Sequence, residues 1–356
     1  MINYWIALTL AAAVPSMSSP SGFSPDDSGT AVGGDRLVEV ATSDRQWTGV
    51  AVSAAGRVFV NFPRWRDQVP VSVGELDGKG SVAPYPNEEL NSWKAGDNPS
   101  TRFVCVQSVY VDRLDRLWIL DPASPMLSGV VEGGAKLMRV DLATNKVELV
   151  HIFDETVAPP RSYLNDVRID TASETAFITD SGLGAIVVVD LETGSARRLL
   201  DGHPSTKAEQ TSVTIDGRPI PLVVNADGIA LDQAGGWLYY QALTGRTMYR
   251  VPVAALLDTG QSAGELERKV ERFAKSGVSD GLLYGPEGVY VSSVEDGAIK
   301  VVGADGSVKT LVRDPRIVWP DSFALGPYGA VWFTTSQIHL GPNPSSPYRV
   351  LKITPR

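Results

Sequence analysis

Six polar residues recur along the chain at a nearly fixed spacing from an aromatic residue. Each lies 10 to 12 positions before an aromatic side chain that sits inside a short apolar run. The polar residues are Thr48, Gln107, Asn165, Asp227, Asp280 and Asp321. Carboxylate and amide oxygens suit hard cations such as calcium or magnesium, and a ring of carboxylates would equally attract an ammonium group. If folding brings these residues together, they form a site for a cation.

The segments that carry these residues have the pattern of short β-strands. Residues 165–170 alternate, a polar turn follows, and further apolar runs surround Phe177 and cover residues 186–191. Alternation with period two indicates a strand with one buried face, and the Gly, Asp and Ser clusters between runs suit tight turns. The six aromatics are Phe59, Trp118, Phe177, Tyr239, Tyr290 and Trp332. Their position in the middle of a strand predicts packing between neighbouring units.

The unit occurs six times, and this count predicts the fold class. Hairpins at residues 136–153, 186–200 and 299–312 supply third and fourth strands. Six units of four antiparallel strands, arranged radially, make an all-β, six-bladed β-propeller, which protects its sheet edges by circular repetition. The sixth unit has room for only three strands, the last at 348–353. We therefore expect the N-terminal strand, at 36–41, to close the last blade.

In such a propeller the first strand of each unit lines the central channel, so the six polar residues would form a ring at one end. Like charges forced together raise one another's pKa unless a cation is bound. The simpler interpretation is that each residue caps a strand and bonds to backbone amides. However, all six residues occupy the same position in the repeat, which favours a functional channel. Trp65, Trp93 and Trp319 fall outside the aromatic pattern. Trp319 and Trp65 could line the channel mouth and stack on a ring-containing ligand.

Composition excludes several classes of function. The net charge of -9 argues against a nucleic-acid surface, which needs clustered Lys and Arg. The one cysteine, Cys105, rules out an internal disulfide and a Cys-based zinc site, and its apolar neighbours predict a buried core residue. With three histidines in the chain, no Ser-His-Asp or Cys-His arrangement follows from spacing.

The chain divides into a leader and one domain. An apolar stretch at residues 4–14 is too short to span a bilayer and predicts a signal peptide at 1–19, although no Lys or Arg precedes it. Residues 20–35 read as a disordered leader, and 36–356 as a single domain without a membrane span. We expect a secreted or periplasmic monomer. The long irregular insertions, 63–102 and 201–221, are candidates for the rim of a pocket.

Several short motifs resemble the yellow and major royal jelly protein family, in the family's order from about residue 36 to the end. They are Phe62-Pro63-Arg64-Trp65, Val106-Gln107-Ser108-Val109, Leu117-Trp118-Ile119-Leu120-Asp121, Tyr163-Leu164-Asn165-Asp166, Ile178-Thr179-Asp180-Ser181-Gly182, Ala226-Asp227-Gly228-Ile229, Ser279-Asp280-Gly281-Leu282 and Trp319-Pro320-Asp321-Ser322. The resemblance implies a six-bladed propeller that is usually secreted. Family members include proteins linked to dopachrome conversion and salivary proteins that bind biogenic amines inside the channel. Insect members commonly carry disulfides, which a single cysteine cannot supply.

A more distant similarity is to the senescence marker protein and gluconolactonase family. In that family an Asn and an Asp from separate blades hold a divalent metal together with a Glu from the first blade. Asn165 and Asp227 match the pattern, whereas Thr48 stands where the Glu is expected. One ligand is therefore missing, which weakens the case for lactonase chemistry.

Two hypotheses follow, one for a binding protein or isomerase and one for a hydrolase. In the first, the channel binds or converts a small cationic or catechol-like aromatic. Asp227, Asp280 and Asp321 hold its amine or hydroxyl, Gln107 and Asn165 orient it, and Trp319 stacks on it. Its conversion would be a dopachrome-type isomerisation.

In the second hypothesis the chain is a metal-dependent lactonase or related hydrolase. Asn165, Asp227 and Asp280 then hold Ca²⁺ or another divalent cation that polarises a carbonyl. A non-catalytic interaction module is a third alternative, because a fold does not fix a function.

Overall fold

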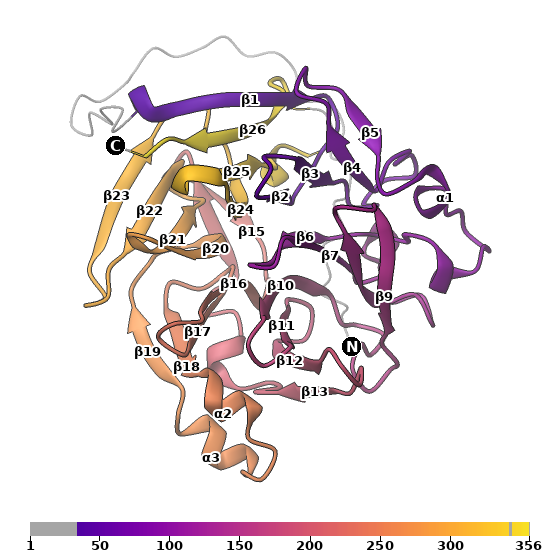
Figure 1. The fold of residues 1–356 in the computed structure, drawn as a ribbon. Coiled ribbons are helices and arrows are strands. Elements are labelled where there is room, and N and C mark those ends of the chain that lie inside the picture. The colour runs from indigo at the N-terminus through magenta and orange to yellow at the C-terminus, as the bar shows by residue number, and fades with distance from the viewer. Residues whose placement is uncertain (1–33, 342–343, 356) are drawn as a thin grey trace.

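Six four-stranded antiparallel sheets stand around a common axis in the computed structural model of the chain (Figure 1). The structure describes residues 34–341 and 344–355. The predicted signal peptide at 1–19 and nearly all of the leader at 20–35 lie outside the described residues. The six-bladed β-propeller predicted from the repeat is confirmed.

Each blade takes its strands from consecutive segments of the chain, with the innermost strand first. The first three blades are β2 (Val50–Val52), β3 (Val58–Asn61), β4 (Val73–Leu76) and β5 (Val82–Pro84); β6 (Ser108–Val111), β7 (Arg116–Asp121), β8 (Lys136–Asp141) and β9 (Lys146–Ile152); and β10 (Leu164–Asp170), β11 (Thr175–Asp180), β12 (Ala185–Asp190) and β13 (Ala196–Leu199). The fourth and fifth blades are β16 (Ala226–Asp232), β17 (Trp237–Ala242), β18 (Met248–Pro252) and β19 (Glu271–Ala274); and β20 (Ser279–Gly285), β21 (Gly288–Ser293), β22 (Ala298–Val302) and β23 (Val308–Arg313).

The sixth blade joins the two ends of the described chain. It contains β24 (Pro320–Leu325), β25 (Val331–Thr335) and β26 (Tyr348–Ile353), and its outermost strand is β1 (Leu37–Ser43). The antiparallel register of β1 on β26 runs from Leu37 opposite Ile353 to Ser43 opposite Tyr348. The predicted closure of the ring by an N-terminal strand is therefore confirmed, and Figure 1 shows the two strands side by side.

Burial decreases from the axis to the rim, as the sequence pattern requires. All seven residues of β10 and of β16 are buried, because these inner strands have neighbouring blades on both faces. The outer strand β9 has no buried residue and alternates between exposed and half-buried positions. Each of the six mid-strand aromatics is at most 8% exposed, and each lies in an apolar cluster, which confirms their predicted role in packing.

The long insertions are more regular than the sequence indicated. Residues 63–102 include β4 and β5, which belong to the first blade, and the short helix α1 (Glu88–Asn91), so their description as an irregular rim loop was wrong. Residues 201–221 contain the hairpin of β14 (Ser212–Ile215) and β15 (Arg218–Pro221). Two further helices, α2 (Val253–Leu257) and α3 (Ala263–Glu267), lie between β18 and β19. No helix in the described ranges is long and apolar enough to cross a membrane.

Deletion of β1 tests the closure of the ring. A chain that begins at residue 44 loses the ladder to β26 and the buried side chains of Leu37 and Ala41. We expect its melting temperature, followed by circular dichroism, to fall by several degrees or more, because β26 becomes an unpaired edge. A chain that begins at Gly34 is the control and should melt as the full chain does. Equal melting temperatures for the two truncated chains would contradict this closure.

Candidate functional site

Four inner strands carry a β-bulge at the predicted polar residue. The register shifts between Leu164 and Val167 in β10, and at the same place in the three other strands. Those shifts fall between Ala226 and Ile229 in β16, Ser279 and Leu282 in β20, and Pro320 and Phe323 in β24. A β-bulge removes residues from the regular pairing of the two strands and changes the direction of their side chains. It thereby frees Asn165, Asp227, Asp280 and Asp321 to point toward the axis.

Hydrogen bonds link the predicted ring residues of three consecutive blades, and the ring residue of a fourth blade, Asp280, lies beside them. The side-chain amide of Gln107 donates to Oδ1 of Asn165 at 3.2 Å, and Nδ2 of Asn165 donates to Oδ2 of Asp227 at 2.7 Å. Asp227 and Asp280 interact electrostatically, and each shifts the pKa of the other. Nε1 of Trp319 then donates to Oδ2 of Asp280 at 2.7 Å. All five side chains are buried.

The remaining two ring residues lie beside these four. Thr48 donates from its hydroxyl to the backbone carbonyl of Gln107 at 3.2 Å. Asp321 accepts a hydrogen bond from the hydroxyl of Ser322 at 3.1 Å and interacts electrostatically with Asp280. The structure therefore brings all six predicted residues close together. Thr48 contacts the backbone of Gln107 and not its side chain.

Of the two tryptophans predicted to lie near the ring, Trp319 contacts a ring residue directly and Trp65 contacts one through Tyr163. Trp319 contacts Asp280 directly, stacks on His339 with ring centroids 5.5 Å apart, and has a backbone φ of 52°. A positive φ is unusual for a bulky residue and indicates backbone strain that its contacts must hold. Trp65 contacts the ring only indirectly. Its Nε1 donates to the hydroxyl of Tyr163, and that hydroxyl donates to the side chain of Gln107. Trp93 instead packs in the apolar core under the guanidinium of Arg64.

Four buried carboxyl groups meet in the channel, one more than the sequence predicted. Burial and the neighbouring carboxyls raise the pKa of Asp227 and of Asp321 well above the usual range. Burial raises the pKa of Asp280 to about 7, against the stabilising hydrogen bond from Trp319. Burial also raises the pKa of Asp166, and its negative charge acts on the other three.

Asp166 was missed because it directly follows the ring residue Asn165, where regular alternation would turn it away. The bulge removes that alternation. The corresponding residues of the other five blades are all small: Gly49, Ser108, Gly228, Gly281 and Ser322. A Cβ atom at Gly228 would lie 2.4 Å from the backbone carbonyl oxygen of Asp280, which shows how closely neighbouring blades approach. A carboxylate in a position otherwise held by Gly or Ser is the signal that could have identified Asp166.

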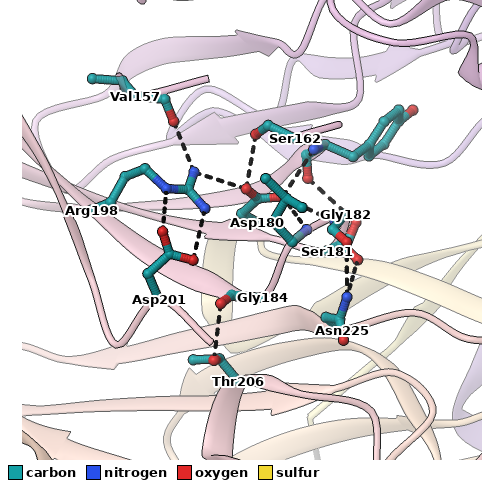
Figure 2. Close-up of polar contacts among 12 residues, drawn as sticks. Val157, Ser162, Asp180, Ser181, Gly182, Gly184, Arg198, Asp201, Thr206 and Asn225 are labelled. Carbon is teal, nitrogen blue, oxygen red and sulfur yellow. Dashed lines mark hydrogen bonds and ion pairs between the residues drawn. The ribbon is translucent and has the colours of Figure 1, made fainter. Parts of the chain in front are cut away.

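Two carboxylates outside the ring, Asp180 and Asp121, fix the segments that lead into it. Asp180, at the end of β11, accepts the backbone N–H of Tyr163 and of Gly182, each at 2.9 Å. Its other oxygen accepts from the hydroxyl of Ser162 and pairs with Arg198 at 2.8 Å (Figure 2). These bonds hold the segment that enters Asn165 from one side and the turn after β11 from the other.

The same arrangement occurs one blade earlier. Asp121, at the end of β7, accepts the backbone N–H of Val104 at 2.7 Å and of Cys105 at 2.9 Å, and pairs with the buried Lys136 at 3.0 Å. This fixes the segment that enters Gln107. Burial raises the pKa of the Cys105 thiol to about 12, and the fully buried side chain confirms the prediction of a core residue.

Asn225 connects the turn after β11 to the start of the fourth blade. Its Nδ2 donates to the carbonyl oxygens of Ser181 and Gly182 at 3.3 and 2.9 Å (Figure 2). Because Asn225 lies two residues before Asp227, the turn held by Asp180 also fixes where the next ring carboxyl begins.

The proposed metal ligands already accept hydrogen bonds. Oδ1 of Asn165 accepts from Gln107, Oδ2 of Asp227 accepts from Asn165, and Oδ2 of Asp280 accepts from Trp319. Within residues 34–341 and 344–355, no group of three or more His, Cys, Asp or Glu side chains is arranged to hold a metal ion. The arrangement is a hydrogen-bonded group of side chains rather than a set of free oxygen ligands, and the calcium site stays a prediction.

The raised pKa of Asp280 predicts an unusual dependence of stability on pH. An unfolded Asp releases its proton near pH 4, whereas folded Asp280 does so near pH 7. The folded state thus binds more protons between these values, and the free energy of unfolding should fall as the pH rises from about 4 to about 7. Denaturant titrations of Asp280→Asn should show a flatter profile over this window. Asp305→Asn, at an exposed turn, is the control and should keep the native slope; an Asp280→Asn profile parallel to the native one would refute the assignment.

Asp180 gives a test of the supporting carboxylates. Asp180→Asn keeps the size of the side chain but removes the charge from a buried ion pair with Arg198. We expect a loss of roughly 2 kcal/mol in the free energy of unfolding, since the amide group of Asn cannot accept from both Ser162 and Arg198, although Arg198 keeps its pair with Asp201. Asp190→Asn, which loses a carboxylate that accepts two amides of a surface turn, should cost about 1 kcal/mol or less. Similar losses for the two variants in urea unfolding would show that Asp180 has no special role.

Comparison with known proteins gives one family and one fold. The family model described as "Major royal jelly protein" matches residues 104–327. Among curated proteins, Dopaminechrome tautomerase of Drosophila melanogaster is 27% identical over 149 residues, which cover 38% of this chain and 26% of that protein. Major royal jelly protein 2 of Apis mellifera is 25% identical over 214 residues, 56% of this chain and 46% of that protein. The chain thus matches about a quarter to a half of the length of these relatives.

The solved structures similar to this chain include propellers named as a gluconolactonase and as regucalcin. A gluconolactonase from Xanthomonas campestris superposes with a TM-score of 0.55 at 14% identity and covers 91% of this chain and 90% of its own. The calcium-binding protein regucalcin from Agrobacterium tumefaciens gives a TM-score of 0.51 at 16% identity, with 89% and 96% covered. Identities this low support the shared fold alone.

Proposed function

The chain belongs to the major royal jelly protein family, and from this premise and its buried carboxyl groups we propose that it binds a small cationic or catechol-like aromatic molecule in the central channel. The relative named Dopaminechrome tautomerase supports a ligand of this class, since dopaminechrome derives from an aromatic amine. Export from the cell, which the N-terminal segment predicts, forms part of the proposal.

The observation that carries the proposal is the imbalance of charge at the ring. Asp166, Asp227, Asp280 and Asp321 are all buried at one place. Across the described ranges, Arg168 is the one cationic side chain paired with any of them, at 3.8 Å from Asp166. Burying carboxyls without a cationic partner is unfavourable for the ionised form and raises their pKa above that of an exposed carboxyl. An ammonium group would supply the missing positive charge.

The positions of the side chains assign them separate roles. Asp280 and Asp321 would bind the ammonium group or a catechol hydroxyl. Gln107 and Asn165, whose amides are locked by their own hydrogen bonds, would keep the acceptors oriented. Trp319 holds Asp280 through its indole N–H, and one of its faces lies on His339.

The raised pKa values of the neighbouring carboxyls Asp227 and Asp280 also make one reaction class chemically available. A tautomerisation removes a proton from one atom of the substrate and returns a proton to another, with no net oxidation. A carboxyl that keeps its proton, beside one with a pKa of about 7, suits acid and base roles near neutral pH. We therefore propose dopachrome-type isomerisation as the reaction to assay, with Asp280 as base and Asp227 as acid.

Isothermal titration calorimetry with dopamine tests the binding proposal. We expect dopamine to bind the native chain and Asp321→Asn to bind it at least about tenfold more weakly, the usual scale for a lost charge-assisted hydrogen bond. The cation favours the ionised carboxyls, so binding should release protons and should tighten as the pH rises from 5 to 8. Buffers with different ionisation enthalpies measure that release.

Two further titrations separate the alternatives. 4-Methylcatechol keeps the ring and hydroxyls of dopamine but has no amine, and should bind more weakly if charge drives recognition. Calcium chloride tests the hydrolase hypothesis: calcium binding that is lost in Asp227→Asn, with no dopamine binding, would replace the amine proposal. If neither dopamine nor calcium binds, the ring has no role as a cation site.

A further inference from the structure

A cavity lies at the opposite end of the inner strands from the carboxylate ring. Its volume is about 310 Å³, within the range of small-molecule sites. The ring residues stand where the inner strands begin, whereas this cavity is lined by residues toward the ends of the same strands, and all six blades contribute. The lining includes Ala51, Tyr110, Arg168, Gln233, Tyr284 and Leu325, one from each blade.

Arg168 separates this cavity from the ring. It lies two residues beyond Asp166 along β10, a rise of about 7 Å, and its guanidinium reaches from the third blade to the fifth. There Nη2 donates to the backbone carbonyl of Leu282 at 2.6 Å, while Nη1 donates to the carbonyl of Val167 at 2.7 Å. The guanidinium also lies over the ring of Tyr110, 5.2 Å from its centroid. Bonds to two separate blades make it a fixed donor rather than a flexible surface cation.

One donor of this guanidinium has no acceptor. Arg168 is 4% exposed, and its buried Nε has no hydrogen-bond partner in the part of the chain that the structure describes. A buried N–H without a partner is unfavourable for stability, and more so when the group is charged. The ion pair with Asp166 is long, at 3.8 Å, and burial raises the pKa of that carboxyl, so it compensates the positive charge only in part.

The charged groups that line the cavity are balanced in number, with Asp112 and Asp115 against Arg113 and Arg168, and both carboxylates already have hydrogen-bond partners. Both oxygens of Asp112 are occupied, by Arg116 and the indole of Trp118 among others. Asp115 accepts the backbone N–H of Ala54 at 2.7 Å. Arg113 adds a second guanidinium at the exposed edge. Much of the remaining wall is aliphatic, including Val52, Leu231 and Leu283.

We propose that this cavity is a second binding site, which takes a small carboxylate carried on an aromatic or apolar group. The carboxylate pairs with the guanidinium of Arg168, and the apolar part lies on the aliphatic wall. The two ends of the channel then select ligands of opposite charge, with the Arg168 guanidinium between them. This site does not rest on amine binding at the ring, and either proposal can fail alone.

Phenylacetate is the probe for this site, because it joins one carboxylate to one ring. We expect calorimetry to show that it binds the native chain, and that Arg168→Gln weakens binding about tenfold or more, as expected for the loss of a charge-assisted hydrogen bond. Asp321→Asn alters the other end of the channel and should leave the affinity unchanged. Benzyl alcohol, of similar shape without the charge, should bind much more weakly than phenylacetate.

A second variant keeps the test decisive if Arg168→Gln does not fold. Leu325 is 42% exposed at the cavity, so Leu325→Trp fills its mouth without disturbing the core, and should also weaken phenylacetate binding about tenfold. Circular dichroism melting confirms that each variant is folded. The proposal is overturned if phenylacetate does not bind, if benzyl alcohol binds equally well, or if a folded Arg168→Gln or Leu325→Trp protein keeps the native affinity.

Discussion

The channel depends on hydrogen bonds that pass from one blade to the backbone of the next ring residue. The hydroxyl of Thr179, on the second strand of the third blade, donates to the carbonyl oxygen of Asp227 at 2.6 Å. Asn61, in the same place in the first blade, donates to the carbonyl of Gln107 at 2.9 Å, and Thr334 of the sixth blade donates to that of Thr48. Each bond satisfies a buried carbonyl that the bulged or unpaired start of an inner strand leaves without a ladder partner.

These bonds also explain why the blades approach so closely. A side chain as short as Thr can reach the next blade only if the backbones nearly touch, and the glycines that follow two ring carboxylates permit that contact. A Cβ atom at Gly281 would lie 2.3 Å from the carbonyl oxygen of Asp321. The geometry that places the carboxyls together is thus set by backbone packing between blades, and the carboxyls themselves are free to vary in charge and protonation.

The fold could be predicted almost completely from the sequence, because it depends on a pattern that repeats. The aromatic spacing gave the blade count, and the missing strand of the last unit gave its pairing with the N-terminal strand. The position of each polar residue, 10 to 12 residues before the aromatic of its unit, was enough to identify the ring residues. Side chains at equivalent positions of a radial repeat lie around the same axis. Asp166 and Arg168 could not be found in this way. The first faces the channel because of a bulge that breaks the period of two, and the second because its long side chain crosses to another blade.

The same limit applies to Trp319, whose sequence position near the ring was correct but whose role depends on contacts that no spacing shows. Its strained backbone and its indole bond to Asp280 place it as a support for one carboxyl. Burying four carboxyls, a strained tryptophan and a guanidinium with an unpaired Nε along one axis is unfavourable for stability, and apolar residues of similar size would fill this channel at lower cost. Proteins that retain such groups usually do so at functional sites, where the local rules of packing give way to chemistry. The packing of the fold, which the aromatic clusters between blades already provide, therefore does not account for the polar groups along the axis.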